Sequence, residues 1–90
     1  MPERHAIVGS KVGLHARPAA LFVQTVARQP VKVTIAKPGS APVDARSILS
    51  VLALNAKGGD EVVLSAEGEG ADAALDEVAA LVARDLDSEE

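Results

Sequence analysis

The chain contains no cysteine, tryptophan or tyrosine, and Phe22 is its only aromatic residue. Without cysteine, neither a disulfide framework nor a thiolate zinc site can form. The single aromatic side chain offers no stacking platform for single-stranded nucleic acid, and a net charge of −4 argues against a DNA-binding protein. His5 and His15 are the only histidines, which is too few for a histidine-rich site, so we expect no metal and no cofactor.

Long apolar stretches are also missing, because no uninterrupted hydrophobic run approaches the length that spans a membrane. The first five residues, Met-Pro-Glu-Arg-His, lack the apolar segment of a signal peptide. We therefore expect a cytoplasmic protein that does not bind membranes. The 90 residues, 48% of them hydrophobic, predict one domain over residues 1–90 with a frayed tail at 87–90.

Acidic and basic residues are unevenly distributed along the chain. Residues 1–59 hold eight basic and two acidic side chains, whereas residues 60–90 hold one basic and eleven acidic side chains. A basic surface on an acidic protein would attract an anionic ligand or an acidic partner. The alternative is that the acidic excess only solvates a C-terminal helix and its tail.

The hydrophobic pattern predicts four short strands and three amphipathic helices. The strands are expected over residues 4–9, 31–35, 41–44 and 61–66, and the helices over residues 18–29, 48–54 and 71–86. The order strand, helix, strand, strand, helix, strand, helix favours an α+β fold, in which a mainly antiparallel four-stranded sheet carries the helices on one face.

A histidine stands at the expected start of the first helix, in the sequence Gly-Leu-His-Ala-Arg-Pro-Ala-Ala of residues 13–20. Pro18 suits a first helical turn, and the unpaired N–H groups of Ala16 and Arg17 make this helix end suitable for phosphate. A neutral imidazole is a nucleophile near pH 7. We therefore predict that His15 carries a phosphoryl group, held by Arg17 and by these backbone amides. The alternative is an ordinary surface histidine.

Ser47 and the residues after it allow two further interpretations. The Ser47 hydroxyl can cap the second helix, or it can be a phosphorylation site beside Arg46. Ile48, Leu49 and Leu52 cannot all face inward from one short helix, so part of this segment can form an exposed apolar patch near His15 with Ala20 and Leu21 of the first helix. The alternative is that these residues complete a thin core.

These motifs resemble the HPr family, the histidine-containing phosphocarriers of the bacterial phosphoenolpyruvate:sugar phosphotransferase system. The resemblance is carried by residues 13–20, by Ala-Arg-Ser-Ile-Leu at 45–49 and by the Ala-Lys-Gly turn at 56–58. It implies an open-faced β-sandwich with three helices on one face of the sheet. It also implies a stoichiometric carrier and not an enzyme. Nothing in the sequence demands an oligomer, so we expect a monomer.

The resemblance further implies roles for particular residues and partners. Enzyme I would phosphorylate His15 at Nδ1, Arg17 would help to hold the phosphoryl group, and His15 would donate it to the IIA units of sugar permeases. Ser47 matches the position that HPr kinase/phosphorylase modifies, and Ile48 and Leu49 match residues that dock partners. The alternatives are a paralogue in a nitrogen or dihydroxyacetone phosphorelay and, in another class, a small regulatory domain that binds an anion or another ligand.

Overall fold

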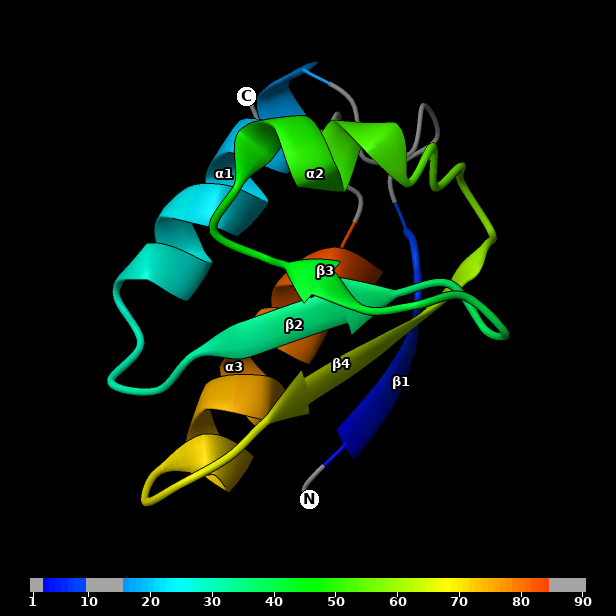
Figure 1. The fold of residues 1–90 in the computed structure, drawn as a ribbon. Helices are drawn as coiled ribbons and strands as arrows, with labels where there is room; N and C mark the ends of the chain where they lie inside the picture. Colours follow the sequence, from blue (N-terminus) through cyan, green and yellow to red (C-terminus); the bar gives the residue numbers. More distant parts are fainter. Residues whose placement is uncertain (1–2, 10–15, 85–90) are drawn as a thin grey trace.

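Four strands form one antiparallel sheet in the computed structural model, which describes residues 3–9 and 16–84 and, of Ala16 and Arg17, only the backbone. The strands are β1 (Glu3–Ile7), β2 (Val33–Ala36), β3 (Val43–Asp44) and β4 (Glu61–Ala66), in the spatial order β1-β4-β2-β3. The helices are α1 (Ala16–Ala27), α2 (Ile48–Ala53) and α3 (Ala71–Ala83), and all three lie on one face of the sheet (Figure 1). The predicted α+β, open-faced arrangement is confirmed.

The core lies between the sheet and the helices, where the predicted alternation places it. In β4, Val62, Leu64 and Ala66 are buried, whereas the residues between them are partly exposed. Burying each large apolar side chain contributes about 1.5–3 kcal/mol, so this single layer supplies much of the stability. The largest fully buried side chains are Phe22, Ile35, Leu64, Leu75, Val8, Val26, Val33, Val51, Val62, Val78 and Val82.

Several predicted boundaries are wrong by two residues or more. The first strand ends at Ile7 and not at residue 9, the third strand begins at Val43 and not at residue 41, and the first helix spans residues 16–27 and not 18–29. The strand expected from residue 31 begins at Val33, because Val33 pairs with Ala66, the last residue of β4, and earlier residues have no partner there. The helix expected to reach residue 86 ends at Ala83, because Arg84 has an extended backbone with φ −80° and ψ 149°. Residue 86 and the predicted tail at 87–90 lie outside the described residues.

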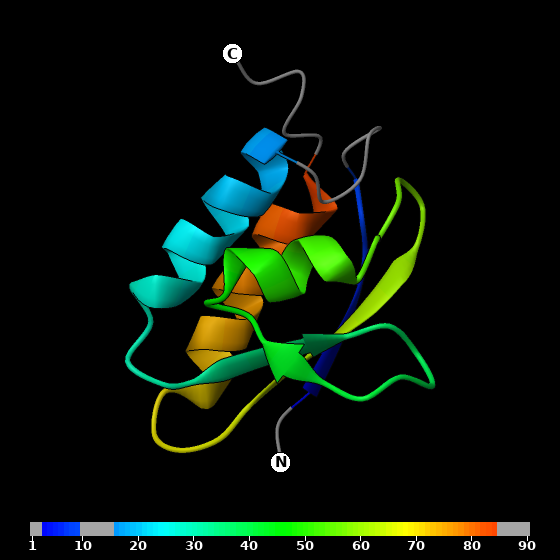
Figure 2. The same cartoon turned by 45° about the horizontal axis from the view of Figure 1, so that its top comes forward.

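The end of β1 is held against the end of α3. The Gly9 amide donates a hydrogen bond to the Val82 carbonyl oxygen at 3.0 Å, and a Cβ atom on Gly9 would lie 2.1 Å from the Ala83 carbonyl oxygen. The start of α1 and the end of α3 lie at the same end of the molecule in both views (Figures 1 and 2). Across residues 3–9 and 16–84, no helix has the length and apolar character needed to cross a membrane.

Candidate functional site

Helix α1 begins at Ala16, directly after the predicted phosphoryl acceptor. His15 itself lies outside the described residues, and of Arg17 only the backbone is described. Behind this helix start, Pro18 and Ala19 are buried, which fixes the first turn of α1 against the rest of the fold. The early backbone N–H groups of a helix generally have no intrahelical partner, which is the reason for predicting that the amides of Ala16 and Arg17 bind an anion at this end.

The Ser47 side chain caps α2, as one of its two interpretations predicted. The Ser47 backbone is extended, with φ −95° and ψ 111°, and its Oγ accepts a hydrogen bond from the Ser50 amide at 3.3 Å. Arg46 is exposed, and its Nε lies 3.7 Å from Oδ1 of Asp44. Ser47 as a whole is half-buried.

An exposed apolar patch begins directly after Ser47. Leu49 is 77% exposed and Ile48 is 38% exposed, whereas Leu52 is half-buried and packs against the core. Ala20 in α1 is half-buried, and α2 lies beside α1 in both views (Figures 1 and 2). The prediction that not all of these residues of α2 face inward is confirmed. We call Ala20, Ile48 and Leu49 the apolar patch.

Basic residues of the first part of the chain make ion pairs with acidic residues of the second part. Arg4 in β1 lies 3.0 Å from Asp76 and 3.5 Å from Asp72, both in the first half of α3. Lys37 lies 3.7 Å from Asp60. The separation of charge along the sequence is therefore partly cancelled in space, because these pairs join the two parts.

His5 lies on the open face of the sheet, in an acidic environment that sequence reasoning missed. Its Nδ1 shares a hydrogen bond with the Glu61 carboxylate, and its Nε2 lies 3.6 Å from Oε1 of Glu3. The hydrogen bond to Glu61 is the main cause that raises the pKa of His5 above its ordinary value. The two carboxylates contact opposite ring nitrogens, and within the described part of the chain no three His, Cys, Asp or Glu side chains form a metal-binding group.

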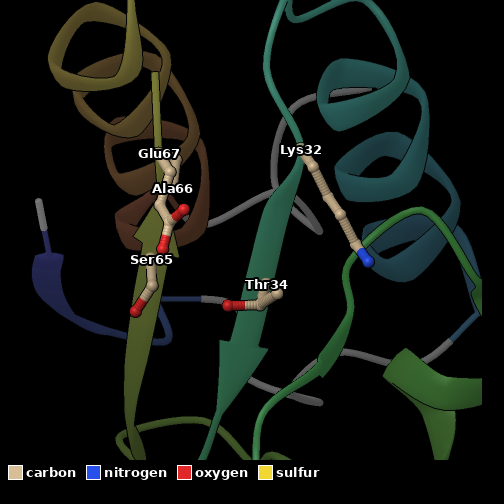
Figure 3. Close-up of a pocket in the computed structure, with 5 residues that line it drawn as sticks. All are labelled: Lys32, Thr34, Ser65, Ala66 and Glu67. Atoms are coloured by element: carbon tan, nitrogen blue, oxygen red, sulfur yellow. The ribbon is translucent and has the colours of Figure 1, made fainter. Parts of the chain in front are cut away.

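A shallow depression of about 260 Å³ also lies on the open sheet face (Figure 3). Its lining residues are Lys32, Thr34, Ser65, Ala66 and Glu67. The Thr34 hydroxyl is directed toward β4, but the Lys32 side chain extends to the other side of β2 (Figure 3). Because these polar groups do not converge on one point, the depression lacks the arrangement that catalysis or tight anion binding requires.

Comparison with known proteins identifies the family. The family described as "PTS HPr component phosphorylation site" matches residues 2–84. The phosphocarrier protein HPr of Streptomyces coelicolor is 52% identical over 87 residues, which cover 97% of this chain and 94% of that protein. The HPr-like protein Crh of Bacillus subtilis is 41% identical, with 96% of this chain and all of that protein covered.

The fold gives the same answer as the sequence comparison. The crystal structure of a phosphocarrier protein HPr from Bacillus anthracis superimposes with a TM-score of 0.84 at 38% sequence identity. The match covers 90% of this chain and 95% of that one. The chain therefore belongs to the HPr family of the phosphotransferase system, whose members are phosphocarrier proteins and not enzymes.

Proposed function

We propose that this chain accepts a phosphoryl group on His15 from phosphorylated enzyme I and donates it to the IIA units of sugar permeases in the cytoplasm, without a cofactor. The observation that carries the proposal is the start of α1 at Ala16, directly after His15, within a family match that spans the whole motif. A helix start at this point supplies unpaired backbone amides beside the phosphoryl acceptor. An ordinary surface histidine does not require such amides beside it.

The transfer forms a P–N bond on His15 as the bond between the phosphoryl group and enzyme I breaks. The lone pair on Nδ1 of His15 attacks the phosphorus atom, and the electron pair of the bond that breaks returns to the donor atom of enzyme I. The phosphoryl group on His15 then carries close to two negative charges. The Arg17 guanidinium and the N–H groups of Ala16 and Arg17 stabilise this charge by charge-assisted hydrogen bonds. Transfer to a IIA unit repeats the exchange in the other direction.

Partner docking is assigned to the apolar patch. Leu49 and Ile48 expose their side chains on α2, beside the helix that begins after His15. Exposed apolar residues of this kind gain free energy when a partner covers them. Enzyme I and the IIA units would use the same patch in turn, so the carrier remains a monomer between encounters.

Ser47 is proposed as a regulatory site for HPr kinase/phosphorylase. It directly precedes Ile48, so a phosphate on its hydroxyl places a dianion at the edge of the apolar patch. An apolar surface next to a dianion is harder to desolvate, and docking to a partner that is acidic there becomes weaker. Phosphorylation of Ser47 should therefore slow the labelling of His15.

The proposal is tested with purified enzyme I and phosphoenolpyruvate. The wild-type chain should gain one phosphate that is lost in acid, as expected for a P–N bond, and His15→Ala should gain none. Ser47→Ala is the matched control, because it removes the other predicted phosphorylation site and should leave the labelling unchanged. An acid-stable phosphate that depends on Ser47 should form only with an ATP-dependent HPr kinase.

A second assay separates the sugar branch from the paralogue alternatives. The phosphorylated chain is mixed with IIA units of sugar permeases and, separately, with the acceptors of nitrogen and dihydroxyacetone phosphorelays. Fast transfer to the sugar IIA units supports the proposal. Transfer that is fast only to another acceptor would place the chain in that branch of the family.

A further inference from the structure

A groove between α1 and α3 has no role in the proposed phosphoryl transfer. It is an open groove of about 270 Å³, lined by Thr25, Arg28, Glu77, Ala80, Leu81 and Arg84. Glu77, Ala80 and Leu81 are spaced at three to four positions, so they lie along one stripe of α3, and Arg84 directly follows that helix. Thr25 lies near the end of α1, and Arg28 directly follows it. The two helices therefore present polar and charged groups to a common space.

Among the described residues, Thr25 is the polar residue that is buried, with 6% of its surface exposed. Its Oγ1 accepts a hydrogen bond of 3.4 Å from Nη2 of Arg28. Buried hydroxyl groups normally make full hydrogen bonds, because an unsatisfied one costs about 1–3 kcal/mol. Thr25 lines the groove, and besides accepting from Arg28 its hydroxyl has one hydrogen to donate.

The charges in the groove define the kind of ligand that fits it. Arg28 contributes a guanidinium group, which binds phosphate through paired hydrogen bonds. Glu77 contributes a carboxylate, which repels a bare anion but accepts hydrogen bonds from hydroxyl groups. Ala80 and Leu81 add an apolar wall. We propose that this groove binds a small phosphate monoester that carries hydroxyl groups.

The groove is distinct from the helix end that receives the phosphoryl group in the proposed function. Thr25 lies nine residues after Ala16, which corresponds to about 14 Å along α1. Ligand binding beside Thr25 and Arg28 is therefore independent of whether His15 is phosphorylated. The inference does not rest on the proposed function, and either one can fail alone.

The probe is glycerol 3-phosphate, and its binding to the full chain is measured by the chemical shifts of the backbone amides in NMR spectra. Saturable shifts are expected at Thr25, Arg28, Ala80 and Leu81, and inorganic phosphate should bind more weakly because it offers no hydroxyl-bearing carbon chain to Glu77. Glycerol alone should cause no shifts. If the shifts are confined to the first turn of α1, the probe occupies the phosphoryl site and the groove proposal is wrong.

Variants identify the groups that bind the probe. Arg28→Ala should weaken the binding of glycerol 3-phosphate by about ten-fold or more, because it removes a charged hydrogen-bond donor. Thr25→Val keeps the shape of the side chain and should weaken binding without changing the labelling of His15 by enzyme I. Arg46→Ala is the matched control, because Arg46 is an exposed arginine outside the groove. Equal affinity in the wild-type chain and in Arg28→Ala would overturn the proposal.

Discussion

Gly9 is the position where a single added methyl group should disturb the fold most directly. A Cβ atom built on Gly9 lies 2.1 Å from the carbonyl oxygen of Ala83 and 3.0 Å from the carbonyl carbon of Arg84. Both neighbours are backbone atoms, so no side chain can rotate away. Bringing the shortest contact to 3.0 Å requires the end of β1 and the end of α3 to separate by 0.9 Å.

That separation also breaks a hydrogen bond. The Gly9 amide lies 3.0 Å from the Val82 carbonyl oxygen, and moving the two segments apart by this distance takes the pair beyond normal bonding range. The lost bond costs about 0.5–1.5 kcal/mol, and forcing extra volume into a packed site costs about 1–3 kcal/mol. We expect Gly9→Ala to lower the free energy of unfolding by about 2–4 kcal/mol.

Urea denaturation followed by circular dichroism measures this loss, because the chain has no tryptophan or tyrosine for fluorescence. Hydrogen exchange provides the local readout, since protection of the residue 9 amide should fall in Gly9→Ala. Gly39→Ala is the control: nothing lies within 4 Å of its added Cβ, and its φ of +84° costs about 1–2 kcal/mol without affecting protection at residue 9. If Gly9→Ala retains both wild-type stability and wild-type protection, the close approach is not real.

Substitutions at three further positions test local features of the structure. Ser47→Ala should lower the free energy of unfolding by about 1 kcal/mol because it removes the cap of α2. Ser47→Asp should keep most of the wild-type stability, because a carboxylate can also cap a helix. Equal losses of stability in the two variants would contradict the capping role of Ser47. Asn55→Gly should raise it by about 0.5–1 kcal/mol, because φ at this position is +54°, and a loss of stability would show that the side chain is needed. Glu61→Gln should lower the pKa of His5 in an NMR titration. The folded state raises the pKa of His5, so the stabilisation that His5 contributes is complete at pH values below its ordinary pKa. It is lost as the pH rises through the higher pKa of the folded state. An unchanged His5 titration in Glu61→Gln would contradict the contact with Glu61.

Local features of the fold could be predicted because each depends on a few neighbouring residues. The alternation over residues 61–66 gives the strand and its buried side with the correct bounds. The Ser47 cap follows from a hydroxyl placed before an apolar run.

Features that depend on distant residues could not be predicted in the same way. Arg4 contacts Asp76, and His5 contacts Glu61, because of the strand order and the packing of α3 on β1. The short run at 31–35 indicates a strand, but its starting residue depends on where the partner strand β4 ends. The groove between α1 and α3 combines segments some fifty positions apart, so no local pattern indicates it.

The assignment of the candidate site comes from the sequence motif more than from the packing of the fold. The backbone of Ala16 and Arg17 lies at the start of α1, and the family match covers the motif, but His15 lies outside the described residues. Its chemistry is therefore proposed from residue types and from the position of the helix start.

Intact-mass analysis with site mapping, after incubation with enzyme I and phosphoenolpyruvate, tests the central claim most directly. We predict that one acid-labile phosphate is found on His15, and that its formation is slowed in Arg17→Ala and abolished in His15→Ala. A chain that gains no phosphate under these conditions, or one that gains the same phosphate in His15→Ala, would contradict the account.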